Sequence, residues 1–244
     1  MHAKLIVGLM LGIFLGGSAL ADPKPGSNEA VIKKALLTKF SGAHVQNIQK
    51  TPYDGLYEVL MDGQLLYTDA KVNYLFAGNL IDAKTQRNLT AARMRDLMQV
   101  KFDTLPLDLA IKQVKGDGKR KMAVFSDPDC PYCKKLDADL VNVNNVTIYT
   151  FLYPIASLHP DADSHAKAIW CAPDRARAWD DLMRSGTLPQ TGTDCATPLA
   201  KIAELGSQLR INGTPTIIFA DGLRVPGAVP VAQLEKLLNG ERTR

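Results

Sequence analysis

Hydrophobic and polar positions change their period several times along the 244-residue chain. Residues 28–40 carry apolar side chains at helical spacing, which predicts an amphipathic helix. Strand patterns follow at residues 53–61, 64–68 and 72–76, and Asp62-Gly63 between the first two is typical of a hairpin turn. Residues 22–83 are therefore predicted to form a small α+β domain, one helix followed by a meander of strands.

This predicted domain is small for independent stability, because a domain of about 60 residues buries a limited share of its surface. It contains no cysteine that could cross-link it. A second copy could cover an exposed sheet edge and enlarge the core. We therefore expect a homodimer that forms through residues 22–83.

The pattern changes after this domain. A helical pattern covers residues 90–102 and ends before Leu105-Pro106, because proline disfavours helix in the residue before it. We interpret residues 84–105 as a linker helix. Beyond it the expected elements follow the order β-α-β, helical block, β-β-α, which is that of an α/β thioredoxin-like domain with a helical insertion over residues 106–244. The expected strands cover residues 111–114, 122–125, 146–152, 216–219 and 223–225, and the expected helices lie at 130–142, within 161–210 and at 231–238.

The first residues have the pattern of an export signal. Lys4 is followed by the apolar run Leu5 to Leu15, and Ser18-Ala19-Leu20-Ala21 supplies small residues for cleavage. The alternative is a retained membrane anchor, but the apolar run is short for a span of about 20 residues. We expect residues 1–21 to be a signal peptide and the mature protein to be exported.

The composition mainly excludes certain classes of protein and partner. The chain is 46% hydrophobic and 22% charged, as in ordinary globular proteins. Its net charge of +4, without an aromatic-rich basic stripe, gives no reason to expect a nucleic-acid partner.

Export changes how the four cysteines are interpreted, because exported thiols either pair or perform redox chemistry. Three pairings are possible, and the spacing favours Cys130 with Cys133 and Cys171 with Cys195. For the second pair, two free buried cysteines remain the alternative.

Cys130-Pro131-Tyr132-Cys133 follows a predicted buried strand and opens a predicted helix. Free N–H groups and the helix dipole stabilise a thiolate there, and proline suits the first turn. Cys130 is expected to be the nucleophile, and Cys133 to resolve the mixed disulfide that Cys130 forms. A zinc half-site and a cysteine–histidine hydrolase are the alternatives. A zinc site would need a second close pair of ligands, which the sequence does not offer. A hydrolase would not need Cys133. We therefore expect neither a metal nor a cofactor.

A second motif points to the same site. Gly213-Thr214-Pro215-Thr216 precedes the strand predicted at 216–219, and a proline there cannot donate a ladder hydrogen bond. The motif fits if the Thr214–Pro215 bond is cis; an ordinary trans proline is the alternative. The backbone beside it could then pair with an extended substrate segment. Thr214 and Pro215, with Pro131 and Tyr132, are therefore the candidate substrate-binding residues.

These motifs resemble those of bacterial periplasmic disulfide isomerases, the DsbC/DsbG family. Residues 125–136 (FSDPDCPYCKKL) are similar to its active-site segment, residues 167–172 (KAIWCA) to the segment that carries the first structural cysteine in the DsbC branch, and residues 213–216 to its cis-proline loop. The resemblance implies a V-shaped homodimer with a cystatin-like N-terminal dimerisation domain, a linker helix and a thioredoxin-fold catalytic domain.

The same resemblance implies the activity and its partners. The protein would reduce and isomerise incorrect disulfides in exported, misoxidised proteins of the periplasm, with chaperone-like substrate binding. A membrane reductase of the DsbD type would keep Cys130 and Cys133 reduced. A periplasmic oxidase or dedicated reductase is the first alternative, and a binding module with incidental cysteines is the second.

Three features bear on the branch and on the mechanism. Pro131-Tyr132 replaces the Gly-Tyr that is usual in the DsbC branch, whereas the pair Cys171 and Cys195 favours that branch and is interpreted as a structural disulfide. The buried acid of thioredoxin would align with Val124, so the acceptor of the Cys133 proton is not evident. Asp127 and Asp129 are the nearest candidates, but both are better explained as residues that start the helix.

Overall fold

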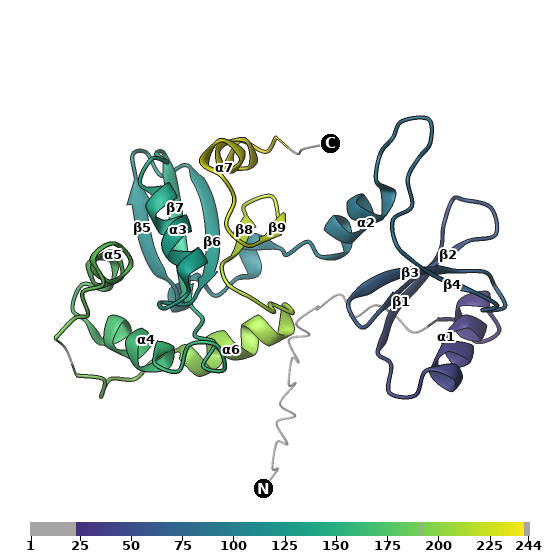
Figure 1. Cartoon of the computed structure of the whole chain (residues 1–244), viewed down its shortest axis with the longest axis horizontal. Coiled ribbons are helices and arrows are strands. Elements are labelled where there is room, and N and C mark those ends of the chain that lie inside the picture. Colours follow the sequence, from purple (N-terminus) through teal and green to yellow (C-terminus); the bar gives the residue numbers. More distant parts are fainter. Residues whose placement is uncertain (1–22, 191, 242–244) are drawn as a thin grey trace, which may run out of the picture. The chain divides into compact units, whose positions relative to one another are not determined.

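The computed structural model describes residues 23–190 and 192–241, and the chain divides into two compact units between Ala91 and Ala92 (Figure 1). The expected signal peptide lies outside the described residues. Across the described ranges, every helix is too short or too polar to cross a membrane.

The first unit consists of one helix and an antiparallel four-stranded sheet in the order β1-β2-β3-β4. Its elements are α1 (Asn28–Lys39), β1 (Val45–Lys50), β2 (Tyr57–Met61), β3 (Gln64–Thr68) and β4 (Leu75–Ala77). The Ser27 hydroxyl accepts a hydrogen bond from the Ala30 N–H and caps α1. Ile32 and Leu36 of α1 are fully buried in one cluster with Tyr57 and Val59 of β2, so the helix covers one face of the sheet.

The structure corrects three strand predictions in this unit. The strand predicted over 53–61 begins only at Tyr57, because residues 53–55 form a turn in which the Leu56 N–H donates to the Tyr53 carbonyl. The segment predicted as a strand over 72–76 begins as a turn, because Val72 has a φ of 56° and the Asp69 carboxylate accepts hydrogen bonds from the Lys71 and Asn73 N–H groups. The strand starts only at Leu75. Strand β1 was not predicted, because three of its six residues are Gln or Asn and its apolar positions are only half-buried.

The predicted helix over 90–102 is shorter in the structure. Helix α2 (Leu89–Leu97) begins after Asn88, whose side chain accepts a hydrogen bond from the Ala91 N–H, and short 3₁₀ turns follow at Phe102–Thr104 and Leu107–Leu109. The chain leaves helical geometry because the Val100 N–H donates to the Gly222 carbonyl and Phe102 is buried in the core of the second unit. Tertiary contacts therefore end this helix earlier than its sequence pattern suggests.

The second unit is built on a five-stranded sheet in the order β5-β7-β6-β8-β9, in which β6 and β7 are parallel and the other neighbours antiparallel. Its strands are β5 (Ile111–Lys115), β6 (Arg120–Ser126), β7 (Val146–Leu152), β8 (Thr216–Phe219) and β9 (Arg224–Pro226). Its helices are α3 (Pro131–Leu140), α4 (Ala162–Cys171), α5 (Arg175–Ser185), α6 (Leu199–Gln208) and α7 (Val231–Leu238).

Both faces of the central strand β6 are buried. Met122 and Val124 pack in one cluster with residues of α3 and α7, whereas Ala123 and Phe125 pack in another with Ile202 of α6. Successive side chains of a strand point to opposite faces, so this alternation places helices on both sides of the sheet (Figure 1). The arrangement is the thioredoxin-like α/β fold with helices α4, α5 and α6 between β7 and β8, as predicted.

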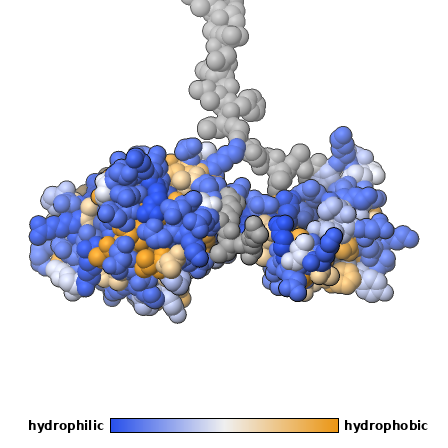
Figure 2. Space-filling model, turned by 90° about the horizontal axis from the view of Figure 1, so that it is seen from above, coloured by the Kyte–Doolittle hydropathy of each residue, from blue (hydrophilic) through white to orange (hydrophobic). Residues whose placement is uncertain are grey.

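The surface is polar over most of its area and interrupted by apolar patches on both units (Figure 2). Large apolar side chains that are exposed in the first unit are Val31, Leu37, Phe40, Tyr53, Tyr74, Phe76 and Ile81; those in the second unit are Val114, Tyr132, Val141 and Leu158.

Candidate active site

The Cys-X-X-Cys motif lies where β6 ends and α3 begins. Cys130 is the N-cap residue of α3 with extended backbone, and Pro131 opens the helix. The Cys130 carbonyl accepts hydrogen bonds from the N–H groups of Cys133 (3.0 Å) and Lys134 (3.1 Å), which form the first turn. The Cys130 sulfur therefore lies at the positive end of the helix dipole, and Cys133 lies one turn further along.

The cis-proline loop lies against this motif. The Thr214–Pro215 bond is cis, which confirms the prediction, and the Cys130 thiol donates a hydrogen bond to the Thr214 carbonyl oxygen (Sγ to O, 3.4 Å). Strand pairing explains the proximity, because Phe125 near the end of β6 is the partner of Thr216 at the start of β8. The residues after β6 and the residues before β8 therefore meet at one edge of the sheet.

The two cysteines differ in their surroundings, although both are free thiols in the structure. Cys130 is 4% exposed and lies beside Tyr132, whose side chain is 66% exposed. Cys133 is 1% exposed, and its burial raises the pKa of its thiol to about 12, only partly opposed by a hydrogen bond with the Ser126 side chain. Cys133 is therefore held as a neutral thiol below the reacting surface.

Two histidine–aspartate pairs hold the loop before Cys130. Asp127 is fully buried; its carboxylate accepts from the N–H groups of Asp129 (2.8 Å) and Ile155 (2.7 Å) and lies 3.0 Å from His159 Nδ1. The Asp129 carboxylate lies 2.8 Å from His165 Nδ1. The sequence did not predict these pairs, because their members are 32 and 36 residues apart and no local pattern joins them.

The contacts of Asp127 bear on two earlier questions, whether it accepts the proton of Cys133 and whether the site holds a metal ion. Both oxygens of Asp127 are engaged in structural contacts, which explains the residue as a loop anchor. Within the described part of the chain, no group of three or more His, Cys, Asp or Glu side chains could hold a metal ion.

Cys171 and Cys195 form a disulfide with a Cα–Cα distance of 5.7 Å. Cys171 is the last residue of α4, and Cys195 lies in the segment between α5 and α6. Helix α4 contributes Ala166, Ile169 and Trp170 to the cluster that also contains Cys130 and Cys133. The disulfide therefore ties the insertion to a helix that packs against the redox motif.

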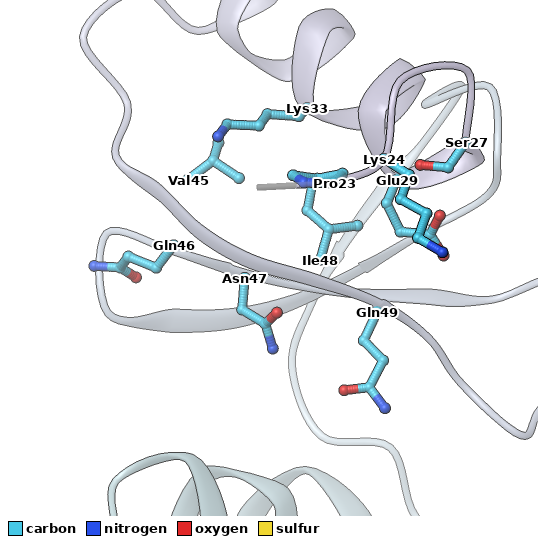
Figure 3. A pocket seen from close by; sticks show the side chains of 10 residues that line it. All are labelled: Pro23, Lys24, Ser27, Glu29, Lys33, Val45, Gln46, Asn47, Ile48 and Gln49. Carbon is cyan, nitrogen blue, oxygen red and sulfur yellow. The ribbon is translucent and has the colours of Figure 1, made fainter. Parts of the chain in front are cut away.

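A surface pocket of the first unit lies between α1 and β1 (Figure 3). Its ten lining residues include no cysteine or histidine: they are Pro23, Lys24, Ser27, Glu29, Lys33, Val45, Gln46, Asn47, Ile48 and Gln49. All four cysteines lie in the second unit, so thiol chemistry belongs there and not to this pocket.

A thiol at a helix N-terminus, a second thiol one turn away and a cis-proline loop in contact with the first define a thiol–disulfide exchange protein of the thioredoxin-like class. Two family profiles match the chain: the thioredoxin-like domain over residues 107–240, and the disulfide bond isomerase protein N-terminal domain over residues 19–91.

Relatives that match most of the chain define the family more narrowly. The chain is 48% identical over 214 residues to the probable thiol:disulfide interchange protein DsbC of Bordetella parapertussis (88% of this chain, 75% of the relative). It is 27% identical over 215 residues to the thiol:disulfide interchange protein DsbC of Escherichia coli K12 (87% and 88%). A crystal structure of a disulfide interchange protein from Neisseria gonorrhoeae is 48% identical with a TM-score of 0.54, over 57% of this chain and all of that chain. The chain belongs to the DsbC family of thiol:disulfide interchange proteins, with Cys130 and Cys133 as its Cys-X-X-Cys pair.

Proposed function

We propose that this protein reduces and isomerises incorrect disulfides of exported proteins in the periplasm. Cys130 is the nucleophile, and Cys133 resolves the mixed disulfide. The observation that carries the proposal is the position of the Cys130 thiol, at the N-terminus of α3 and in hydrogen-bond contact with the Thr214 carbonyl.

The substrate is held by the residues that border this thiol. An extended segment of the substrate would pair with the backbone beside Pro215, in the manner of strand addition, and bring its disulfide to Cys130. Tyr132 and the neighbouring Pro131, which follow Cys130 directly in the sequence and are both exposed, offer further apolar contact. The exposed apolar side chains of both units support chaperone-like binding of misoxidised proteins (Figure 2).

Isomerisation requires a reduced Cys130 at the start of each cycle, because the thiolate is the group that attacks. We propose that a membrane reductase of the DsbD type supplies the electrons. The Cys171–Cys195 disulfide is structural and takes no part in this cycle. An oxidase or dedicated reductase is the alternative, and the match of residues 19–91 to the isomerase N-terminal domain favours the isomerase.

We propose that residues 22–83 form a dimerisation domain, residues 84–105 a linker and residues 106–244 the catalytic domain. Support for a homodimer comes from β4, an edge strand of three residues whose Phe76 is 56% exposed. An unpaired edge strand can pair with a second copy. Beside it lies a groove lined mainly by apolar residues, namely Leu56, Tyr67, Phe76, Ala77, Gly78, Asn79 and Leu80.

Two assays on the mature chain test the activity. The reduced protein should restore activity to scrambled ribonuclease and should reduce insulin; Cys130→Ala should abolish both while leaving suppression of aggregation intact. Disulfide donation without rescue of scrambled ribonuclease would establish the oxidase alternative. Exchange that survives Cys130→Ala would refute the assigned nucleophile.

Light scattering tests the dimer. We expect a dimeric mass for the mature chain and for Val114→Glu, which alters a 57% exposed apolar side chain of the second unit. Phe76→Glu, a matched change at β4, should lower the mass toward that of a monomer. A monomeric mature chain would refute the homodimer, and an unchanged Phe76→Glu dimer would refute this interface.

A further inference from the structure

A buried carboxylate lies one helical turn from the resolving cysteine. Asp137 of α3 is four residues after Cys133, and side chains at that spacing lie on the same face of a helix. The residue is 7% exposed. Buried carboxylates are uncommon in proteins unless they are paired or functional, so this position needs an explanation.

Asp137 and Cys133 line the same small cavity. The cavity offers about 10 Å³ to the centre of a water molecule, which is room for one water. Ser126, Thr150 and Gln113 line it and carry hydroxyl and amide groups that a water could bind, whereas the indole N–H of the lining residue Trp179 is donated to Asp137. The remaining lining residues are apolar: Val124, Leu136, Leu140 and Ile148.

One oxygen of Asp137 is available to take up a proton. Oδ1 accepts a hydrogen bond from the Trp179 indole N–H (3.1 Å), whereas Oδ2 is buried without a hydrogen-bond partner among the described residues. Arg184 forms an ion pair with this carboxylate, its Nε lying 3.5 Å from Oδ2, in a geometry that leaves Oδ2 without a hydrogen bond. Leaving a buried carboxylate oxygen unsatisfied costs free energy, which a bridging water would recover.

We propose that Asp137 accepts the proton of Cys133, through a water in this cavity, when Cys133 resolves the mixed disulfide. The assignment rests on the proposed roles of the two cysteines and extends them. The water takes the proton of the Cys133 thiol and passes one of its own to Asp137. The Cys133 thiolate attacks the Cys130 sulfur, a Cys133–Cys130 bond forms, and the bond from Cys130 to the substrate breaks. The electron pair leaves on the substrate sulfur; the protein dithiol is oxidised and the substrate reduced.

The electrostatics of the cavity suit this transfer. Burial raises the pKa of Asp137 and the neighbouring Asp180 raises it further, whereas the hydrogen bond from Trp179 and the positive charge of Arg184 oppose the shift without cancelling it. A raised pKa makes the carboxylate a better base for a thiol whose own pKa is about 12.

Charged and titratable groups near Asp137 come from three elements. The charged groups are Asp180 and Arg184 on α5 and Lys115 on β5, and the titratable thiols of Cys130 and Cys133 lie at the start of α3, the helix of Asp137 itself. Strands β6 and β7 present only uncharged side chains to the cavity. Because the pKa of Asp137 is raised, its carboxylate gains a proton at a higher pH than an ordinary carboxylate does as the solution is acidified. Resolution should therefore slow on the acid side.

The reaction of the reduced protein with an aromatic disulfide that releases thionitrobenzoate tests the proposal. The first release reports attack by Cys130, and the second reports attack by Cys133 on the mixed disulfide. In Asp137→Asn we expect an unchanged first phase and a second phase about 100-fold slower at neutral pH. The inflection that comes from Asp137 should disappear from the pH profile, and the second phase should instead rise steadily with pH in step with the thiolate fraction of Cys133.

Asp139→Asn is the matched control, because Asp139 lies on the same helix and pairs with Lys135 at the surface. Both phases should stay as in the parent. If Asp137→Asn leaves the rate or the pH profile of the second phase unchanged, Asp137 is not the proton acceptor. The proposed function would still stand in that case, provided that the first phase, attack by Cys130, is observed. A parent protein without a first phase would overturn the proposed function itself. Urea unfolding of each variant checks that it is folded.

Discussion

The resolving cysteine should be far less reactive toward external reagents than an ordinary thiol. The Cys130→Ser variant leaves Cys133 as the single free thiol, since Cys171 and Cys195 are bonded to each other. Desolvation, the main cause of the raised pKa at Cys133, persists in this variant, because the residue stays 1% exposed under the same core.

The magnitude follows from the thiolate fraction. A thiol with a pKa of about 12 has about 10⁻⁴ of its population ionised at pH ~8, whereas an ordinary cysteine of pKa ~8.5 has about 0.2. Alkylation proceeds through the thiolate, so iodoacetamide should react about 10³-fold more slowly with Cys133 than with a free cysteine. The rate should also keep rising with pH beyond the point at which an ordinary thiol levels off.

Intact-mass spectrometry of native Cys130→Ser over time measures this rate. A short cysteine peptide under the same conditions provides the reference, and the same variant in denaturing urea should react as fast as the peptide. A native rate within tenfold of the peptide's would refute the argument that burial keeps Cys133 protonated.

Three further changes concern stability. Replacing both Cys171 and Cys195 with Ala should lower the free energy of unfolding by about 3.5 kcal/mol in urea titrations, because their disulfide closes a loop with a sequence separation of 24. Gly206→Ala would place a Cβ 2.2 Å from the Tyr153 ring and should cost about 1–3 kcal/mol, visible as a lower melting temperature. Phe125→Ala removes a fully buried ring and should cost about 3–5 kcal/mol in the same urea assay.

Each change has a control. The free energy of unfolding of the double cysteine variant should equal that of the parent protein under reducing conditions, in which the disulfide is open. A clear difference between these two values would contradict the argument from loop closure. Gly192→Ala, where a Cβ meets no atom within 4 Å, should leave the melting temperature unchanged. Val114→Ala at the surface should cost less than about 0.5 kcal/mol. Equal effects at Gly206 and Gly192 would show that the Tyr153 contact is not tight.

Local patterns in the sequence determined much of the fold. Strands β7 and β8 and helix α7 have the bounds that the sequence predicted, because each carries apolar residues at the period of its own secondary structure and ends at local turn or helix-breaking residues. The Cys-X-X-Cys motif at the start of a helix and the proline before β8 also have local signatures. The sequence therefore predicted the thioredoxin-like unit and the reacting pair.

The tertiary structure decided what depends on partners distant in sequence. Strand β1 is too polar to be recognised until its neighbour β2 supplies the hydrogen bonds, and α2 ends early because Val100 pairs with Gly222. At the site, nothing in the sequence distinguishes Asp137 from any other acidic residue of a helix. Only the packing of Trp179 and strands β6 and β7 around it encloses its carboxylate beside Cys133, because burial is a property of the assembled core and not of any segment.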